Sequence, residues 1–477
     1  MHRRLTGILV AMALATSMNS PAHAAEPAAV APAETPASAQ AHRFLDALTN
    51  GDDARFLGFI HDASPRSKLS DDQWLELRPN LRQLKFHGLL AATPTTADLS
   101  VFDGARDSWA RLLITVEPEP PHAIATFGIR NARRPADVPP PPKLQPAALI
   151  AAVKARLEAE AAADKFSGAV LIAKDGKPIF TQAYGLADRE ARTPITAETQ
   201  FRYGSMGKMF TAVSILQLEQ AGKLDLTAPV GRYLKAYPNA AIATKVTIEN
   251  LLTHTGGTGD IFGAEFTAHR LSLHDAKDYV ALYGARPPEF PPGDRVAYSN
   301  YGFMLLGRIV EAASGLSYDD YVQQHIYAPA GMTDTGMLPE TVHLAHRATG
   351  YRREQGQLVS AADTQPYRGT PAGGGYSTVG DLLRFGNALT LGRLLDGEHL
   401  KRLTTGGITG ADGTFYRYDF GGTTSEGSRF IGHAGGAPGM NGELRVFPDD
   451  GYTVVVLANR DPPVATVIAS FISDRLP

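Results

Sequence analysis

The sequence of 477 residues contains no cysteine. Without thiol groups the chain can form no disulfide, no thiolate metal site and no cysteine nucleophile. The residue to which lipid is attached in bacterial lipoproteins is missing as well. We therefore expect any exported form of the chain to be a soluble protein.

A strong excess of either charge is also missing. The chain carries 46 lysines and arginines against 49 aspartates and glutamates, which leaves a formal net charge of −3. Proteins dedicated to nucleic acid show a strong basic field, so this balance argues against such a partner. Hydrophobic residues make up 43% and charged residues 20%, as in ordinary globular proteins. Because single cores rarely exceed about 250–300 residues, the length predicts two or three domains.

The apolar run near the N-terminus is short. It extends from Leu5 to Met18, below the roughly 20 residues that a bilayer-spanning helix needs. Two arginines precede it, and Ala22-His23-Ala24 follows with the small-x-small pattern of a signal cleavage site. We predict a signal peptide over 1–24, no membrane span after cleavage, and a periplasmic or secreted protein; an uncleaved anchor is the alternative. Residues 25–40 are rich in Ala, Pro and Glu, which predicts a disordered leader.

A first folded unit is predicted over residues 41–133. Apolar residues at helical spacing indicate helices around Phe44 and Phe56, and Ser70 is placed to cap a third. Helices followed by strand-like runs predict a small α+β domain, which in this order resembles NTF2-like domains. We favour a structural or substrate-presenting accessory role for it. The strand-like runs are 109–117 and 122–130.

Four consecutive prolines, Pro139 to Pro142, mark a boundary, and we interpret 134–146 as a stiff linker. The second domain, 147–477, shows hairpin patterns near both of its ends, at 167–185 and at 444–458. With helical patterns between them, these hairpins predict one antiparallel sheet built from both ends of the domain. Helices would pack on its faces, which is an α+β sandwich.

The strongest chemical signal is a Ser-x-x-Lys motif. Ser205 precedes a helical pattern that runs to Gly222, and Lys208 lies one helical turn further on the same face. The helix N-terminus favours the charge of an activated serine, and a desolvated lysine amine can act as its base or hold a neighbouring base reactive. Taken alone the motif is weak, because a capping serine beside a solvated lysine gives the same pattern.

Two further motifs follow in a characteristic order. Tyr298-Ser299-Asn300 comes after a Pro-Gly turn, and His433-Ala434-Gly435-Gly436 comes after a strand-like run. With Ser205 and Lys208, this order resembles the serine β-lactamase and penicillin-binding-protein superfamily. It is closest to the branch with class C β-lactamases, D,D-peptidases and esterases. The resemblance covers residues 149–477 and implies the β-lactamase-like fold, an antiparallel sheet flanked by helices plus an all-helical lobe.

The resemblance implies roles for the motif residues. Ser205 would attack the acyl carbon, and Lys208 would lie against Ser205 and Tyr298. Tyr298, its pKa lowered by nearby positive charge, would take the serine proton and pass it to the leaving group. Asn300 would orient Lys208 and a substrate amide. No cofactor is implied.

The third motif is expected to shape the far wall of the active site. Gly435 would let its strand approach the substrate, and the backbone N–H groups of Gly436 and Ser205 would form an oxyanion hole. His433 departs from the family, because lactamases of this branch usually have lysine there. A histidine of ordinary pKa is mostly neutral at pH 7, so we expect weaker recognition of β-lactam carboxylates.

These features predict a serine hydrolase that acts on a small ester, amide or D-amino-acid peptide, as an esterase or peptidase before a β-lactamase. The first alternative is a slowly deacylating sensor of β-lactams or cell-wall fragments. The second is a chain whose N-terminal domain binds the ligand while the hydrolase domain serves as a scaffold. We expect no metal site, since the histidines lack ligand spacing. His254 is interpreted as structural, and Gly373-Gly374-Gly375 as a flexible wall of the site.

Overall fold

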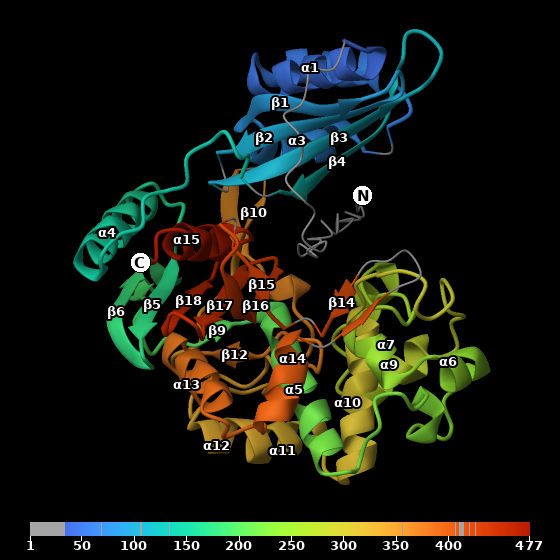
Figure 1. The fold of residues 1–477 in the computed structure, drawn as a ribbon, viewed down its shortest axis with the longest axis vertical. Helices are drawn as coiled ribbons and strands as arrows, with labels where there is room; N and C mark the ends of the chain where they lie inside the picture. The colour runs from blue at the N-terminus through green and yellow to red at the C-terminus, as the bar shows by residue number, and fades with distance from the viewer. Residues whose placement is uncertain are drawn as a thin grey trace, which may run out of the picture. The chain divides into compact units, whose positions relative to one another are not determined.

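The computed structural model describes residues 34–477 except 68, 105–106, 133, 355, 406, 410–414, 419 and 425. The chain forms two compact units (Figure 1). Among the described residues, the larger unit contains Leu144–Gly422 and Arg429–Pro477, and the smaller contains residues 34–143 together with Thr423–Ser428. Within the described residues, no helix combines the length and the apolar character that crossing a bilayer requires.

The smaller unit consists of three helices and a four-stranded antiparallel sheet. Its sheet is a simple meander in the order β1-β2-β3-β4. The two strands predicted from sequence, β3 and β4, are confirmed, whereas β1 and β2 were not expected. The elements are α1 (Pro36–Thr49), α2 (Asp53–Ala63), α3 (Asp71–Leu81), β1 (Leu84–Ala92), β2 (Thr96–Asp103), β3 (Ser108–Val116) and β4 (Ile124–Asn131).

Helix α1 corrects the predicted disordered leader, 25–40, over residues 36–40, whereas residues 25–33 lie outside the described part of the chain. Thr35 caps α1 by accepting the Ser38 backbone N–H at 3.2 Å, and a proline occupies the first turn. Phe44 on this helix is 1% exposed and packs beside Trp74. Apolar burial therefore outweighs the disorder-prone composition. Residues 134–145 contain neither helix nor strand, in keeping with the predicted linker, and α4 begins at Pro146.

A six-stranded antiparallel sheet forms the centre of the larger unit, in the order β15-β16-β17-β18-β5-β6. The terminal hairpin pairs with the initial one through β18 and β5, where Val455 faces Leu171. The prediction of one sheet built from both ends is confirmed. The strands are β5 (Gly168–Lys174), β6 (Lys177–Tyr184), β15 (Gly422–Thr423), β16 (Arg429–Ala437), β17 (Met440–Phe447) and β18 (Tyr452–Ala458).

Successive side chains of the sheet point to opposite faces and belong to two separate hydrophobic cores. Val454 and Val456 belong to a core with α4 (Pro146–Ala162) and α15 (Val464–Ser473). Val455 and Leu457 point the other way, into a core with α5 (Gly207–Gln220) and α13 (Val379–Thr390). Both faces are covered, so β18 reads as a continuous apolar run rather than an alternating one.

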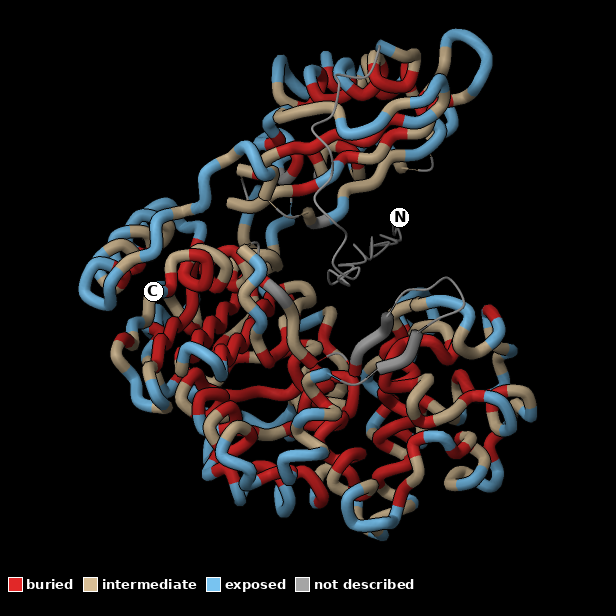
Figure 2. Tube along the Cα trace, viewed as in Figure 1, coloured by how far each residue is buried: buried red, intermediate tan, exposed pale blue. Residues whose placement is uncertain are grey.

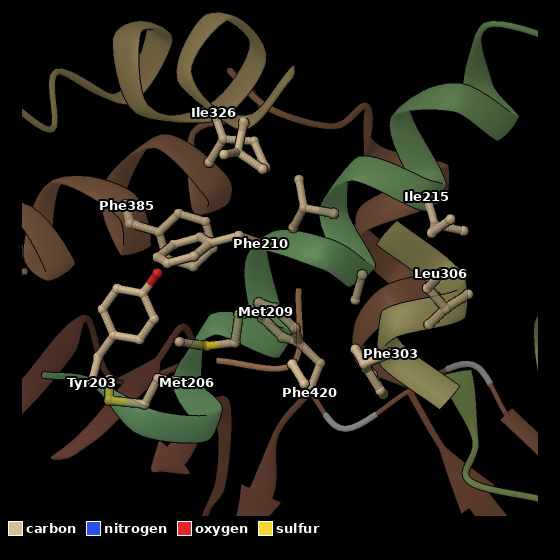
Figure 3. Close-up of a cluster of buried hydrophobic side chains, with 14 of the residues drawn as sticks. Tyr203, Met206, Met209, Phe210, Ile215, Phe303, Leu306, Ile326, Phe385 and Phe420 are labelled. Carbon is tan, nitrogen blue, oxygen red and sulfur yellow. The ribbon is translucent and has the colours of Figure 1, made fainter. Parts of the chain in front are cut away.

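Helix α5 lies at the centre of the larger core. Eleven of its residues are buried, including Lys208, and Figure 2 shows this helix in the red interior. Figure 3 shows its apolar side chains, with Phe210 beside Phe385 and Met206 near Tyr203. The Phe210 ring makes edge-to-face contacts with two others, and its centre lies 5.0 Å from that of Phe385 and 5.6 Å from that of Tyr203. A helix packed on all sides fixes the residues at its N-terminus.

A helical lobe lies beside α5, and its long helix α10 contacts α5, α7 and α9. Its helices are α6 (Ala240–Lys245), α7 (Ile248–Leu252), α8 (Ala264–His269), α9 (Ala276–Tyr283) and α10 (Asn300–Ser314). The remaining elements are β7 (Leu186–Asp188), β8 (Thr193–Pro194), β9 (Phe201–Arg202), η1 (Gly204–Met206), η2 (Val230–Arg232), α11 (Tyr318–Val322), η3 (Gln323–Tyr327), α12 (Ala328–Ala330), β10 (Tyr351–Glu354), β11 (Gln357–Ser360), η4 (Ala362–Thr364), β12 (Tyr376–Ser377), α14 (Gly397–Thr405), β13 (Gly407–Thr409) and β14 (Phe415–Arg417).

Candidate active site

Ser205 lies in a single 3₁₀ turn, η1, which leads directly into α5. The turn is possible because Gly204 adopts a positive φ of 54°. Gly374 donates its N–H to the carbonyl oxygen of Gly204 at 3.1 Å, and Tyr203 donates to the carbonyl oxygen of Gly375 at 3.0 Å. The predicted position of the serine at a helix N-terminus is therefore confirmed.

The glycine segment 373–375 differs from the flexible wall that its sequence suggested. A Cβ on Gly373 would lie 2.1 Å from the carbonyl oxygen of Gly204, and one on Gly375 would lie 2.1 Å from the hydroxyl of Tyr203. These distances leave no room for any side chain. The segment packs directly against the Ser205 turn and supports it, and glycine is needed for this close approach rather than for flexibility.

Lys208 is fully buried, and its amine makes three polar contacts. The Nζ atom lies 2.7 Å from Oδ1 of Asn300, 2.7 Å from the carbonyl oxygen of Ala372 and 3.4 Å from Oγ of Ser205. Amide and carbonyl oxygens can only accept hydrogen bonds, so two N–H groups of the lysine are committed to them. The nitrogen is also within hydrogen-bond distance of the serine oxygen.

Tyr298 completes the group around the lysine. The Lys208 Nζ atom lies 4.8 Å from the centre of the Tyr298 ring and 5.3 Å from that of Phe303. A cation over aromatic faces is stabilised by the ring quadrupole. Tyr298 is half-buried, whereas Lys208 is enclosed. The structure thus brings together Ser205, Lys208 and Tyr298 from separate parts of the sequence.

Asn300 is the first residue of α10, with Ser299 as the helix cap. Its Oδ1 accepts from Lys208, while its Nδ2 donates to Oδ2 of Asp260 at 3.2 Å. The Asn300 backbone N–H donates to Oδ1 of the same aspartate at 3.0 Å. The predicted contact between Asn300 and Lys208 is confirmed, and Asp260 is a functional candidate that the sequence analysis missed.

The segment 254–260 holds all three residues of the Tyr298-Ser299-Asn300 motif. The His254 ring lies against that of Tyr298, with centres 4.4 Å apart and planes inclined by 39°, and its Nδ1 accepts the Ser299 backbone N–H at 3.1 Å. Ser299 Oγ donates to the carbonyl oxygen of Gly259 at 2.5 Å. The structural hydrogen bond expected of His254 is present, and its ring adds a direct contact with a predicted site residue.

Strand β16 closes the other side of the Ser205 turn. A Cβ on Gly435 would lie 1.9 Å from the carbonyl oxygen of Tyr203 and 2.9 Å from the backbone nitrogen of Ser205. A Cβ on Gly204 would lie 2.7 Å from the backbone nitrogen of Gly436. The backbone nitrogens of Ser205 and Gly436 therefore flank the same tight contact, where the sequence predicted an oxyanion hole. Only glycine permits β16 to come this close.

His433 lies on β16 opposite Leu444 and is only 7% exposed. Its Nδ1 donates to the carbonyl oxygen of the neighbouring Ala434. The imidazole is therefore buried and held in place on the sheet. The lysine that lactamases usually have at this position is instead a flexible side chain that can reach toward solvent.

Two groups within three residues of Ser205 have shifted pKa values because they are buried. Burial, followed by the charge of Arg347, lowers the pKa of Arg202 to about 9, and this guanidinium pairs with Glu340. Burial also raises the pKa of the Tyr203 hydroxyl. Tyr203 is thus a neutral packing group beside the serine. Within residues that the structure describes, no cluster of His, Cys, Asp and Glu could hold a metal ion.

Known proteins share this architecture. A family model described as Beta-lactamase matches residues 153–475. Esterase EstB of Burkholderia gladioli is 36% identical over 185 residues, covering 36% of this chain and 47% of that protein. A penicillin-binding protein from Bacillus halodurans is 31% identical with a TM-score of 0.58, covering 66% of this chain and 99% of that one. A D-stereospecific amidohydrolase from Streptomyces sp. is 28% identical with a TM-score of 0.57, covering 67% and 97%.

The family match includes every predicted site residue and the whole central sheet with its helical lobe. The penicillin-binding protein and the amidohydrolase share the mixed α+β architecture seen here. With more than half of its length matched, the chain belongs to the β-lactamase family of serine hydrolases.

Proposed function

We propose that the chain hydrolyses small esters, amides or D-amino-acid peptides through an acyl-enzyme on Ser205. The observation that carries the proposal is the fully buried Lys208, whose Nζ atom contacts Ser205, Asn300 and the Ala372 carbonyl. Burying an ammonium group costs free energy, so a buried lysine in contact with a nucleophile indicates a functional role. Relatives named as an esterase and a D-stereospecific amidohydrolase point to the same substrate class.

The proposed first step forms a bond between Ser205 Oγ and the acyl carbon of the substrate. Tyr298, as phenolate, takes the hydroxyl proton, and the adjacent charge of Lys208 stabilises that phenolate. The backbone N–H groups of Ser205 and Gly436 stabilise the oxyanion, which collapses to the ester while Tyr298 returns the proton to the departing alcohol or amine. Water then attacks the acyl-enzyme, transfers a proton through the same tyrosine, and releases the carboxylic acid and free Ser205.

Esters, amides and peptides are preferred over β-lactams because of His433. The side chain is 7% exposed and bonded to the backbone of Ala434, so it offers no mobile cation to a substrate carboxylate. The sensor alternative receives no specific support from the geometry. Export through the predicted signal over 1–24 remains part of the proposal and fits cell-wall peptides as substrates; that segment lies outside the described residues.

A substrate panel tests this preference. The value of kcat/KM is measured for an activated ester, a D-amino-acid amide and a chromogenic cephalosporin with the wild type and with His433→Lys. We expect the ester or amide to lead for the wild type. The substitution should improve cephalosporin turnover, since it restores a cation near the substrate carboxylate. A wild type that favours the cephalosporin, or a substitution without gain, would contradict this account of specificity.

A further inference from the structure

We propose that Asp260 is a positioning residue for catalysis: it fixes the orientation of the Asn300 amide and thereby the state of Lys208. This inference rests on the proposed function, because it assigns a supporting residue to the same reaction. Asp260 lies on the segment between α7 and α8, and Asn300 begins α10. Two hydrogen bonds join them, from the Asn300 backbone N–H at 3.0 Å and from its Nδ2 at 3.2 Å.

The first step of the argument concerns the direction of the amide. An asparagine side chain can turn by half a revolution and exchange its donor and acceptor ends. A carboxylate only accepts, so Asp260 selects the orientation that presents Nδ2 to it. That orientation turns Oδ1 toward Lys208 Nζ, at 2.7 Å. With the amide reversed, two donors would face each other across the Lys208 contact.

The second step concerns charge. Asp260 and Lys208 bind opposite ends of one amide, so a negative charge lies one side chain away from the ammonium. This charge polarises the amide oxygen and favours protonated Lys208. It also disfavours the phenolate of Tyr298, whose ring lies 4.8 Å from the same Nζ atom. Asp260 thus sets the pH at which the base becomes active.

The aspartate is itself held firmly. Its Oδ1 accepts the Ile261 backbone N–H at 2.8 Å, and Arg286 Nη1 donates to its carbonyl oxygen at 2.7 Å. The guanidinium of Arg286 also lies over the rings of Tyr283 and Tyr301, 4.4 and 5.1 Å from their centres. A residue anchored at both its side chain and its backbone can define the position of its partner.

Other titratable groups surround this pair and belong in any account of pH. Arg286 follows α9, and Glu289 lies beside Gly259, whose added Cβ would be 3.0 Å from the glutamate Oε1. His254 faces Tyr298 from the same segment as Asp260. A substitution that changes only the charge of Asp260 leaves all of these groups in place.

The test compares Asp260→Asn with Asp260→Glu and with a matched control, Asp275→Asn. Asp275 caps α9 in the same lobe and pairs with Lys277, so its substitution removes an equal charge from a residue outside the Asp260–Asn300 hydrogen bonds. The pH profile of kcat/KM for an activated ester is measured for each variant. Intact mass confirms that the wild type forms an adduct on Ser205, and melting temperature monitors folding.

For Asp260→Asn we expect the maximal kcat/KM to fall about tenfold to a hundredfold, because the Asn300 amide loses its fixed direction. The acidic limb should move to lower pH by about half a unit, since removing a carboxylate favours the deprotonated base. Asp260→Glu should keep the limb of the wild type, and Asp275→Asn should change neither quantity.

Three outcomes would overturn the inference. One is a limb that does not move in Asp260→Asn, since a merely structural role lowers the rate at every pH alike. Another is an Asp260→Asn profile that matches the Asp275→Asn control. The third is a shifted limb in Asp260→Glu equal to that of Asp260→Asn. A wild type without a Ser205 adduct would instead contradict the proposed function, so the two failures are distinguishable.

Discussion

The contact between β16 and the Ser205 turn gives the sharpest quantitative prediction. In Gly435→Ala the new Cβ would lie 1.9 Å from the carbonyl oxygen of Tyr203 and 2.9 Å from the nitrogen of Ser205. Real Cβ atoms essentially never come closer than 3.0 Å to another atom of this kind. Both partners are backbone, so β16 and the turn must separate by about an ångström. Such a shift moves the two predicted oxyanion donors apart.

The expected size follows from general values. Losing one oxyanion donor lowers kcat by about 10²–10³-fold, and overpacking a rigid contact lowers the unfolding free energy by about 1–3 kcal/mol. Gly435→Ala should therefore lose acylation rate by at least a hundredfold while remaining folded at room temperature. Single-turnover acylation by an activated ester measures the first effect, and denaturant unfolding measures the second.

A matched variant separates these two effects. Gly168 lies on β5 of the same sheet, and a Cβ there would meet the carbonyl oxygen of Leu457 at 2.1 Å. Gly168→Ala should lower the unfolding free energy to a similar extent but retain the acylation rate of the folded protein. The prediction would be refuted if Gly435→Ala and Gly168→Ala lost similar stability but Gly435→Ala acylated as fast as the wild type. The close approach of β16 would then not be needed to position the oxyanion donors.

Three further predictions concern neighbouring groups. His254→Asn keeps the side-chain acceptor and suits the positive φ of 56° at this position, but it removes the ring that contacts Tyr298. The value of kcat/KM should fall about tenfold, and an unchanged value would contradict the positioning of Tyr298 by this ring contact. Tyr298→Phe should lose acylation by about 10²–10⁴-fold; a small loss would assign the base to Lys208 instead. Burial raises the pKa of Glu219, with Arg402 partly offsetting it, so folding favours its protonated form. The unfolding free energy of the wild type relative to Glu219→Gln should therefore fall as pH rises from about 4 through that raised pKa, and denaturant titrations across this range check the sign.

Sequence patterns could predict the central sheet because its hairpins are local. The turns at Asp175-Gly176 and Asp449-Asp450 lie between adjacent runs, and both hairpins form as expected. The pairing of β18 with β5 was predicted because hairpin patterns at both ends of one domain were expected to join a single sheet. Strands β1 and β2 were missed because β1 exposes Phe86 and Leu90 and shows no clear alternation. The helix around Phe44 was predicted, but the start of α1 at Pro36 was missed because its capping threonine stands in an Ala- and Pro-rich stretch.

The site divides in the same way. Ser205, Lys208 and Tyr298 could be identified because family motifs record them, and the structure brings their side chains together. Asp260 carried no motif, and its role depends on hydrogen bonds to a helix 40 residues further along the chain. The contact of Ala372 with Lys208 uses a backbone carbonyl, which no residue type reveals. Contacts made by the backbone and by distant loops become visible only in the folded chain.

The central claim is that Ser205 carries an acyl group during turnover. Intact mass is followed over time after mixing the protein with an activated acyl ester, with Ser205→Ala measured alongside. The account predicts a transient adduct of one acyl group on the wild type only, with continued release of product. An adduct that forms equally on Ser205→Ala, or turnover without any adduct at Ser205, would contradict it.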